Sequence, residues 1–286
     1  MITGKTKVLA VIGNPVDHSM SPVFQNAGIG AAGVDYVYTA FPVLEESLGD
    51  AVAGMKAMGI CGMNVTIPHK EAVMKYLDYI DKDAEILGAV NTIVNNNGVL
   101  TGYNTDVKGF IGGMKQIGFS PRNKQAVLLG AGGAARAVIW GLIQEKVASL
   151  TIGVRNVSKA RPLVEYFSKY IKIVLLDWST PEFDEALVKA QLLVNATPLG
   201  MYPHVAAMPP VNWDKVSRGI LAYDIIYTPA ETLFLKTARE HGCQILNGEA
   251  MLVGQGAESF RLWTGIELDT GLMAKALRQA LADKVS

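Results

Sequence analysis

The segment from Val127 to Val138 constrains the fold of this chain more than any other. Three apolar residues lead into glycines at 130, 132 and 133, and an alanine-rich amphipathic stretch follows. This order predicts a strand, a tight turn and a helix. Glycines let the backbone approach a pyrophosphate, and the amides of a helix N-terminus attract its negative charge. Because the spacing departs from the usual G-x-G-x-x-G, the motif alone leaves open a turn without a ligand.

The strand expected next, Ser149–Val154, indicates which dinucleotide such a turn would bind. It ends at Arg155, about 20 residues past the glycines, where a dinucleotide-binding fold reads the adenosine ribose. An acid there favours NAD, whereas a guanidinium suits the 2′-phosphate of NADP. We therefore predict NADP. The alternative is that Arg155 and Lys159 belong to a solvated helix start, although two cations there oppose the helix dipole.

Composition narrows the class of protein. The chain has 286 residues, of which 50% are hydrophobic, so two domains with sizeable cores are expected. A net charge of zero argues against nucleic acid as a partner. The longest apolar stretch, 126–143, contains glycines and Arg136 and is not expected to span a membrane. Cys61 and Cys243 are predicted to be buried, reduced thiols, and without a signal-peptide pattern a cytoplasmic location is expected.

Apolar runs of strand length alternate with helix-length segments. This alternation predicts an α/β fold with two domains: an N-terminal, mainly parallel α/β domain and a Rossmann-type dinucleotide-binding domain, with a cleft between them. The expected domains are 1–105 plus 248–286 for substrate and catalysis, and 106–247 for the dinucleotide. The expected strands are Val8–Ile12, Tyr36–Phe41, Gly62–Thr66, Thr92–Asn95, Leu100–Tyr103, then 127–129, 150–154, 173–176, 192–195 and 220–226; helices are expected from Pro22, from about Leu44 and over Met251–Trp263.

The loop after the first expected strand carries two hydroxyls. Ser19 and Ser21 lie just before Pro22, which is suited to start a helix. Two hydroxyls beside a helix N-terminus make a seat for a carboxylate. The alternative is helix capping, which Ser21 would satisfy by itself.

Two further loops carry polar side chains at expected strand ends. Asn64 and Thr66 share one face of a strand, and Lys70 follows at an expected helix start, where a lysine is unfavourable. A solvated Lys70 is the alternative. Asn91 and Asp106 follow apolar segments of the expected sheet. Turn formation would explain each of these polar residues taken singly, but it does not readily explain why so many of them occur at expected strand ends.

Eight motifs, in this order, resemble the shikimate dehydrogenases over nearly the whole chain. They are Gly-Asn-Pro-Val-Asp-His-Ser-Met-Ser-Pro from 13, Asn-Val-Thr-Ile-Pro-His-Lys from 64, Gly-Ala-Val-Asn-Thr from 88, Tyr-Asn-Thr-Asp from 103, Gly-Ala-Gly-Gly-Ala from 130, Asn-Ala-Thr-Pro-Leu-Gly-Met from 195, Asp-Ile-Ile-Tyr from 224 and Gly-Glu-Ala-Met-Leu-Val-Gly-Gln from 248.

The resemblance implies a reversible, NADPH-dependent reduction of 3-dehydroshikimate to shikimate, a step in chorismate and aromatic amino-acid biosynthesis. It implies that Lys70 and Asp106 are the catalytic pair, and which of them donates the proton stays open. The substrate residues that it implies are Ser19 and Ser21 for the carboxylate, Asn64, Thr66, Asn91 and Gln255 for ring hydroxyls, and Thr105 and Tyr227 beside them.

The resemblance also implies a cofactor site. Its residues would be Gly130, Ala131, Gly132, Gly133 and Ala134 at the pyrophosphate, Arg155, Asn156 and Lys159 at the 2′-phosphate, Thr197 and Met201 toward the nicotinamide, and Gly248. The family's usual Asn-Arg-Thr is here Val154-Arg155-Asn156, which predicts looser selectivity for NADP.

Three other functions are weighed against this one. A quinate or dual quinate/shikimate dehydrogenase often has threonine in place of Ser21 and an acid near Arg155. A non-catalytic sensor of a pathway metabolite would not need Lys70 and Asp106. A tetrahydrofolate-type dehydrogenase leaves Ser19 and Ser21 unexplained. No metal is expected, because the four histidines lack ligand spacing. The expected partner is a small-molecule substrate, and both monomer and homodimer stay open.

Overall fold

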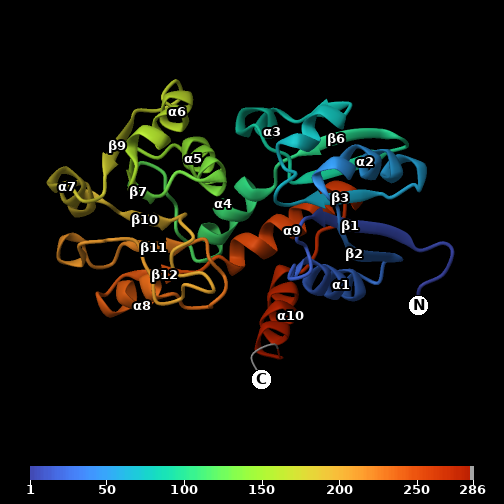
Figure 1. Cartoon of the computed structure of the whole chain (residues 1–286). Helices are drawn as coiled ribbons and strands as arrows, with labels where there is room; N and C mark the ends of the chain where they lie inside the picture. The colour runs from blue at the N-terminus through green and yellow to red at the C-terminus, as the bar shows by residue number, and fades with distance from the viewer. Residues whose placement is uncertain (284–286) are drawn as a thin grey trace. The chain divides into compact units, whose positions relative to one another are not determined.

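The computed structural model describes residues 1–283 and divides the chain into two compact units (Figure 1). Unit 1 contains Met1–Gly109 and the chain from Val253 onward, and unit 2 is Phe110–Leu252. Both boundaries fall inside helices, α4 (Asp106–Gln116) and α9 (Glu249–Thr264). The last three residues of the expected segment 248–286 lie outside the described residues.

Unit 1 is built on a six-stranded mixed sheet with the order β2-β1-β3-β5-β6-β4. Strand β1 is parallel to β2 and β3, whereas β5 is antiparallel to β3 and β6. Among the described strands of this sheet only β5 runs against the others, returning through a tight turn to β6, so the unit is mainly parallel, as predicted. The elements are β1 Lys7–Gly13, α1 Ser21–Ala32, β2 Tyr36–Pro42, α2 Leu48–Ala57, β3 Gly62–Val65, β4 Tyr79–Ile80, α3 Lys82–Leu87, β5 Thr92–Asn96, β6 Val99–Tyr103 and α10 Thr270–Asp283, with 3-10 turns η1 Glu45–Ser47 and η2 Ala72–Tyr76.

The apolar run of β1 forms the centre of unit 1. Leu9 to Ile12 are all buried, and α2 packs on the sheet through Val52 and Met55. The helix expected to end near Trp263 is followed by a further one, α10, which lies against α1. Helix α10 was not among the helices expected from the sequence.

Unit 2 is a doubly wound domain, as predicted. Its six strands are all parallel in the order β12-β11-β10-β7-β8-β9, so the chain reverses direction across the sheet between β7 and β10. Open α/β sheets bind ligands at this switch point. The elements are β7 Gln125–Leu129, α5 Gly133–Gln144, β8 Ser149–Val154, α6 Val157–Phe167, β9 Ile173–Asp177, α7 Pro181–Lys189, β10 Leu192–Asn195, η3 Trp213–Lys215, β11 Leu221–Asp224, α8 Leu233–Glu240 and β12 Gln244–Leu246.

The strands at the centre of unit 2 are apolar on both faces. Val127 to Leu129 and Leu192 to Val194 are buried, as a parallel sheet covered by helices requires. Within residues 1–283, none of the helices has both the length and the hydropathy to cross a bilayer. Cys243 is buried, but Cys61 is only half-buried, which corrects that expectation; both thiols are free.

Two local expectations were wrong. Lys70 does not start a helix: it lies in turns that precede the 3-10 turn η2, so the helix-dipole argument for it does not apply. Ser21 does not cap α1 either, because the cap residue is Met20 and it makes no side-chain cap bond. Ser19 Oγ instead accepts a hydrogen bond from Ser21 N at 3.3 Å.

Candidate active site and nucleotide pocket

Lys70 and Asp106 form an ion pair in unit 1. Lys70 Nζ donates to Asp106 Oδ2 at 2.7 Å, and the two side chains are 30% and 18% exposed. The pair is therefore partly shielded from water but still accessible. An ammonium has three N–H donors, and this bond uses one of them. The Lys70 ammonium, held in this way, can donate a hydrogen bond to an oxygen placed beside it and can exchange a proton with that oxygen.

Asn91 fixes the other oxygen of Asp106. Its Nδ2 donates to Asp106 Oδ1 at 2.8 Å and to Thr105 Oγ1 at 3.1 Å. Its Oδ1 accepts from Thr105 N at 2.8 Å, which also settles the orientation of the amide. Asn91 and Thr105 are buried, so this carboxylate has a rigid support.

A buried hydroxyl network continues from this support. Ser259 Oγ of α9 lies 2.8 Å from Thr92 Oγ1, 3.1 Å from Thr105 Oγ1 and 2.9 Å from Asn64 Nδ2, and it donates to Gln255 O. Helix α9, distant in sequence, thus joins the loops that carry the expected substrate residues.

Tyr38 closes the network at its other end. Its hydroxyl donates to Asn64 Oδ1 at 2.7 Å. Burial raises the pKa of Tyr38 well above its usual value, and a hydrogen bond with Ser21 opposes that shift. The structure therefore connects Ser21, Asn64, Thr105 and their neighbours through Tyr38 and Ser259, neither of which the sequence analysis named.

The remaining expected substrate residues are distributed as follows. Thr66 packs its methyl group against Gly13, where a Cβ would clash. Gln255 lies on α9, with Oε1 3.5 Å from Thr105 Oγ1. Tyr227 belongs to unit 2, where burial raises the pKa of its hydroxyl.

Unit 2 has a pocket of about 350 Å³ at the switch point between β7 and β10. Gly130 follows β7 at φ +98, and a Cβ there would lie 2.8 Å from Thr197 Cγ2, so only glycine fits. A Cβ at Gly132 or Gly133 would meet nothing within 4 Å. The turn is thus open toward the pocket at the N-terminus of α5, which is the arrangement a pyrophosphate requires.

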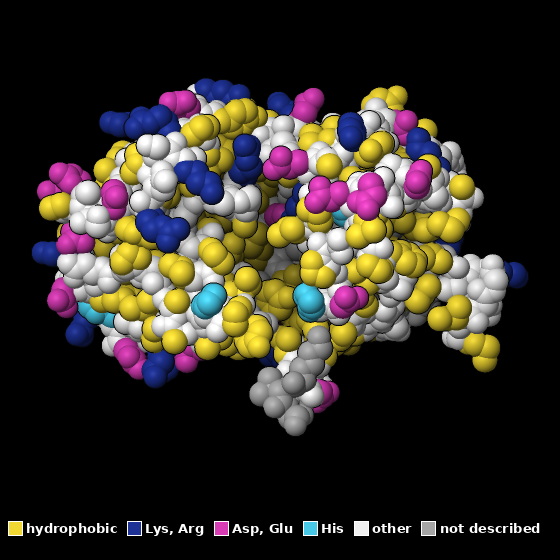
Figure 2. Space-filling view, in the orientation of Figure 1, with side chains coloured by type: hydrophobic (Ala, Val, Ile, Leu, Met, Phe, Trp, Pro, Cys, Tyr) yellow, Lys and Arg dark blue, Asp and Glu magenta, His cyan; other side chains and the backbone are white. Residues whose placement is uncertain are grey.

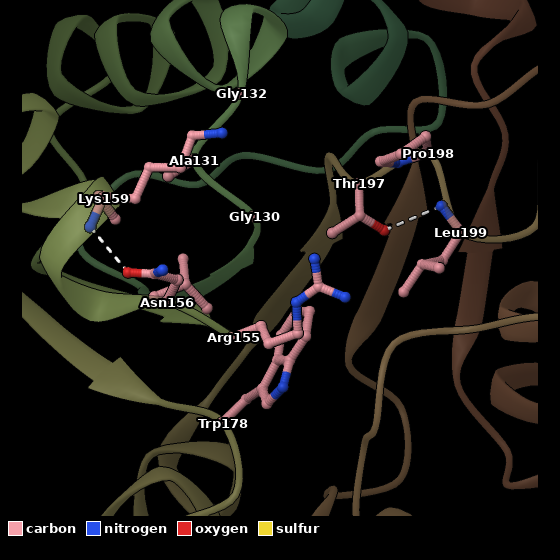
Figure 3. Close-up of a pocket in the computed structure, with 12 residues that line it drawn as sticks. Gly130, Ala131, Gly132, Arg155, Asn156, Lys159, Trp178, Thr197, Pro198 and Leu199 are labelled. Atoms are coloured by element: carbon pink, nitrogen blue, oxygen red, sulfur yellow. Dashed lines mark hydrogen bonds between the residues drawn. The ribbon is translucent and has the colours of Figure 1, made fainter.

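Cations line one side of this pocket. Arg155 and Lys159 border it and are exposed, and Figure 2 shows lysine and arginine side chains gathered over the α6 region of unit 2. Asn156 Oδ1 caps α6 by accepting from Lys159 N at 2.9 Å. Trp178 lies beside Arg155 in Figure 3, and it is an aromatic wall that the sequence analysis missed.

The other expected cofactor residues are partly gathered here. The pocket is lined by Gly130, Ala131, Gly132, Val154, Arg155, Asn156, Lys159, Ala160, Trp178, Thr197, Pro198 and Leu199. Gly133 and Ala134 start α5 next to it. Met201 is 47% exposed beyond that lining, and Gly248 packs on the backbone of Ile225 in unit 2. Within residues 1–283, no group of three or more His, Cys, Asp or Glu side chains is arranged to hold a metal ion.

Comparison with known proteins decides the family. The chain is 44% identical over 277 residues to shikimate dehydrogenase (NADP(+)) of Caldanaerobacter subterraneus subsp. tengcongensis, an alignment that covers 97% of this chain and 98% of that protein. The chain belongs to the shikimate dehydrogenase family. Residues 11–93 match the family's substrate binding domain, and residues 248–278 match the shikimate 5′-dehydrogenase C-terminal domain.

Solved structures of this family and its relatives share the fold. Shikimate 5-dehydrogenase from Listeria monocytogenes in complex with shikimate and NAD has 35% identity and a TM-score of 0.93, covering 96% of this chain and 98% of that one. Quinate dehydrogenase from Corynebacterium glutamicum in complex with NAD has 31% identity and a TM-score of 0.88, covering 96% and 99%.

Proposed function

We propose that this chain catalyses the reversible, NADPH-dependent reduction of 3-dehydroshikimate to shikimate in chorismate biosynthesis. The observation that carries the proposal is the ion pair of Lys70 and Asp106, 2.7 Å long and held by Asn91. Membership of the shikimate dehydrogenase family supplies the substrate class. In this proposal unit 1 binds and converts the substrate and unit 2 binds NADP.

The chemistry requires a proton donor next to the reacting oxygen. Bound NADPH supplies the hydride that reduces the ketone. The oxygen then carries negative charge and must gain a proton. We assign this proton to the pair: Lys70 donates it to the oxygen, Asp106 keeps the ammonium in place, and the neutral amine then takes a proton from solvent. In the reverse direction the same pair removes the hydroxyl proton.

The substrate residues are assigned within this proposal. We assign the carboxylate to Ser19 and Ser21, two hydroxyl residues of one loop, neither of which caps α1. We assign the ring hydroxyls to Asn64, Thr66, Asn91 and Gln255, with Thr105 and Tyr227 beside them. The connected network from Tyr38 to Asp106 supports the assignments of Asn64 and Asn91, since it holds their side chains in single orientations.

The unit 2 pocket suits NADP. The open glycines at the start of α5 accept a pyrophosphate, and Arg155 with Lys159 offers two positive charges to a 2′-phosphate. The Asn156 side-chain oxygen is occupied in capping α6, so Arg155 carries most of the selectivity. The free thiols of Cys61 and Cys243 are consistent with the cytoplasm, where thiols stay reduced.

The test supplies purified protein with 3-dehydroshikimate and NADPH, and follows NADPH oxidation while the product is identified by mass spectrometry. Shikimate formed in proportion to NADPH consumed supports the proposal. Tight binding of shikimate without any turnover would instead indicate a sensor. Light scattering on the same sample separates a monomer from a homodimer.

A quinate or dual-specificity dehydrogenase is the second candidate. One observation leaves room for its use of NAD: Val154 and Asn156 flank Arg155, so the family's usual asparagine and threonine beside that arginine are absent. Quinate oxidation as fast as shikimate oxidation would support it.

A further inference from the structure

Asp224 is a fully buried carboxylate at the end of β11 in unit 2, and the proposed function does not use it. Its exposed fraction is 0%, and burial raises its pKa to about 6. The groups that hold it are neutral: Thr232 Oγ1 donates to Oδ2 at 2.6 Å, while Ile226 N and Asn195 Nδ2 donate to Oδ1 at 3.0 and 3.1 Å. A charge buried among neutral donors is costly to the fold. Its presence therefore calls for a role.

Asn195, at the end of β10, connects this carboxylate to the nucleotide pocket. Its Nδ2 donates to Asp224 Oδ1 and, at 3.4 Å, to Leu199 O. Its Oδ1 accepts from Thr197 N at 3.0 Å and from Thr197 Oγ1 at 2.7 Å. An amide side chain has two donors and two acceptor positions. All four are thus used, three of them in the segment 197–199.

The carboxylate determines which way this amide faces. An ionised carboxylate only accepts hydrogen bonds, so the NH₂ group of Asn195 must point to Asp224. The carbonyl oxygen is then directed at Thr197. The reverse orientation would place two acceptors against each other at Asp224 and two donors against each other at Thr197 N. Asp224 therefore anchors the amide that is hydrogen-bonded to Thr197 and Leu199.

That segment is one wall of the pocket. Thr197, Pro198 and Leu199 line it opposite Asn156 and Lys159, as Figure 3 shows, and Leu199 N donates to Thr197 Oγ1 at 3.2 Å. A Cβ at Gly130 would lie 2.8 Å from Thr197 Cγ2. The wall thus lies close to the glycine turn, and a shift of Thr197 would change the width of the pocket there.

We propose that Asp224 is a positioning residue for cofactor binding: by orienting Asn195 it fixes the pocket wall Thr197–Leu199 on the side away from Asn156 and Lys159. The identity of the cofactor in this inference rests on the proposed function. The positioning itself rests only on unit 2.

The first experiment measures amide hydrogen exchange of residues 196–200 without cofactor. Asn195→Ala and Asp224→Ala remove the link, and we expect about tenfold faster exchange in this segment, because its hydrogen-bonded anchor is lost. Asp224→Asn keeps an acceptor for Asn195 and should give an intermediate rate. Asn212→Ala is the matched control, since Asn212 makes a surface hydrogen bond to Asp184 in the same unit.

The second experiment compares two ligands with the same variants. NADPH should lose about tenfold in affinity in Asn195→Ala and Asp224→Ala, whereas 2′,5′-ADP, which lacks the nicotinamide half of the cofactor, should change by less than about twofold. Equal losses for both ligands would show general damage to the pocket and overturn the inference. Unchanged exchange at 196–200 would also overturn it. A wild-type protein without NADPH-dependent turnover would count against the proposed function, while the exchange measurement would still decide the inference.

Discussion

The polar cluster of unit 1 and the pocket of unit 2 solve different binding problems. In unit 1 the side chains from Tyr38 to Asp106 are mostly buried and hydrogen-bonded to one another, and one ion pair remains accessible. In unit 2 the pocket is open, its floor is glycine backbone, and its cations are exposed. A ring with several hydroxyls and a reacting oxygen needs fixed partners. A pyrophosphate with a 2′-phosphate needs room, amide dipoles and positive charge.

Removal of the accessible ion pair should give the largest effect. We expect Lys70→Ala to lower turnover about a thousandfold, because the general acid is lost, and to leave NADP affinity unchanged. The measurement is steady-state kinetics with a cofactor titration. Lys56→Ala is the control, because Lys56 forms a surface ion pair of 2.8 Å with Asp78. Normal turnover in Lys70→Ala would remove this lysine from the mechanism.

The two units also differ in the partners that they give to a carboxylate, and this difference should appear in the pH dependence of stability. Asp106 is paired with a cation, but Asp224 is held by neutral donors, and burial raises its pKa to about 6. The folded protein therefore binds this proton more tightly than the unfolded chain, so the group favours folding as pH falls from about 7 to about 4. Relative to Asp224→Asn, wild-type stability should rise by up to about 3 kcal/mol over this range. Urea unfolding of both proteins at several pH values measures the difference, and a difference independent of pH would contradict the account.

The exposed cations of unit 2 should affect affinity and not chemistry. Arg155→Ala is expected to weaken NADPH binding about a hundredfold, since a charge-assisted contact to the 2′-phosphate is lost, and to leave NADH binding nearly unchanged. Dissociation constants for both cofactors provide the measurement. Arg239→Ala, which breaks an exposed pair with Glu231, is the control. Equal losses for NADPH and NADH would exclude Arg155 as the selective group.

The smallest effect is expected inside the unit 1 network. Ser259→Ala removes a buried hydroxyl that is hydrogen-bonded to the side chains of Asn64, Thr92 and Thr105. The loss of these bonds should lower kcat/KM about tenfold and lower the free energy of unfolding by about 1–3 kcal/mol. Ser168→Ala is matched to it, because Ser168 makes the same bond to the carbonyl four residues earlier but lies outside the network. Activity of Ser259→Ala equal to that of Ser168→Ala would show that the network does not support catalysis.

The parts of the structure that could be predicted from the sequence are those set by neighbouring residues along the chain. The apolar run before Gly130 and the glycines themselves predicted the strand, turn and start of α5, because each acts on its immediate backbone. Strand direction is not local: the segment 92–96 has the same apolar pattern whether it runs parallel or antiparallel, so the reversal at β5 was not visible.

The residues that the sequence did not reveal are those defined by long-range packing. Ser259 lies in an apolar helix and resembles any helical serine until α9 meets Thr92 and Thr105. Trp178 has no motif around it, although its place after the third strand of a dinucleotide fold is a usable signal. Lys70 was singled out for a helix start that does not exist, yet its ion pair with Asp106 is present.

The most direct test of the account crosses shikimate and quinate with NADP and NAD and measures four values of kcat/KM on the wild-type protein. We expect the kcat/KM for shikimate with NADP to exceed those of the other three combinations, because Arg155 selects the cofactor and the unit 1 network selects the ring. Quinate or NAD rates that equal or exceed it would contradict this specificity, and no turnover in any combination would contradict the enzyme itself.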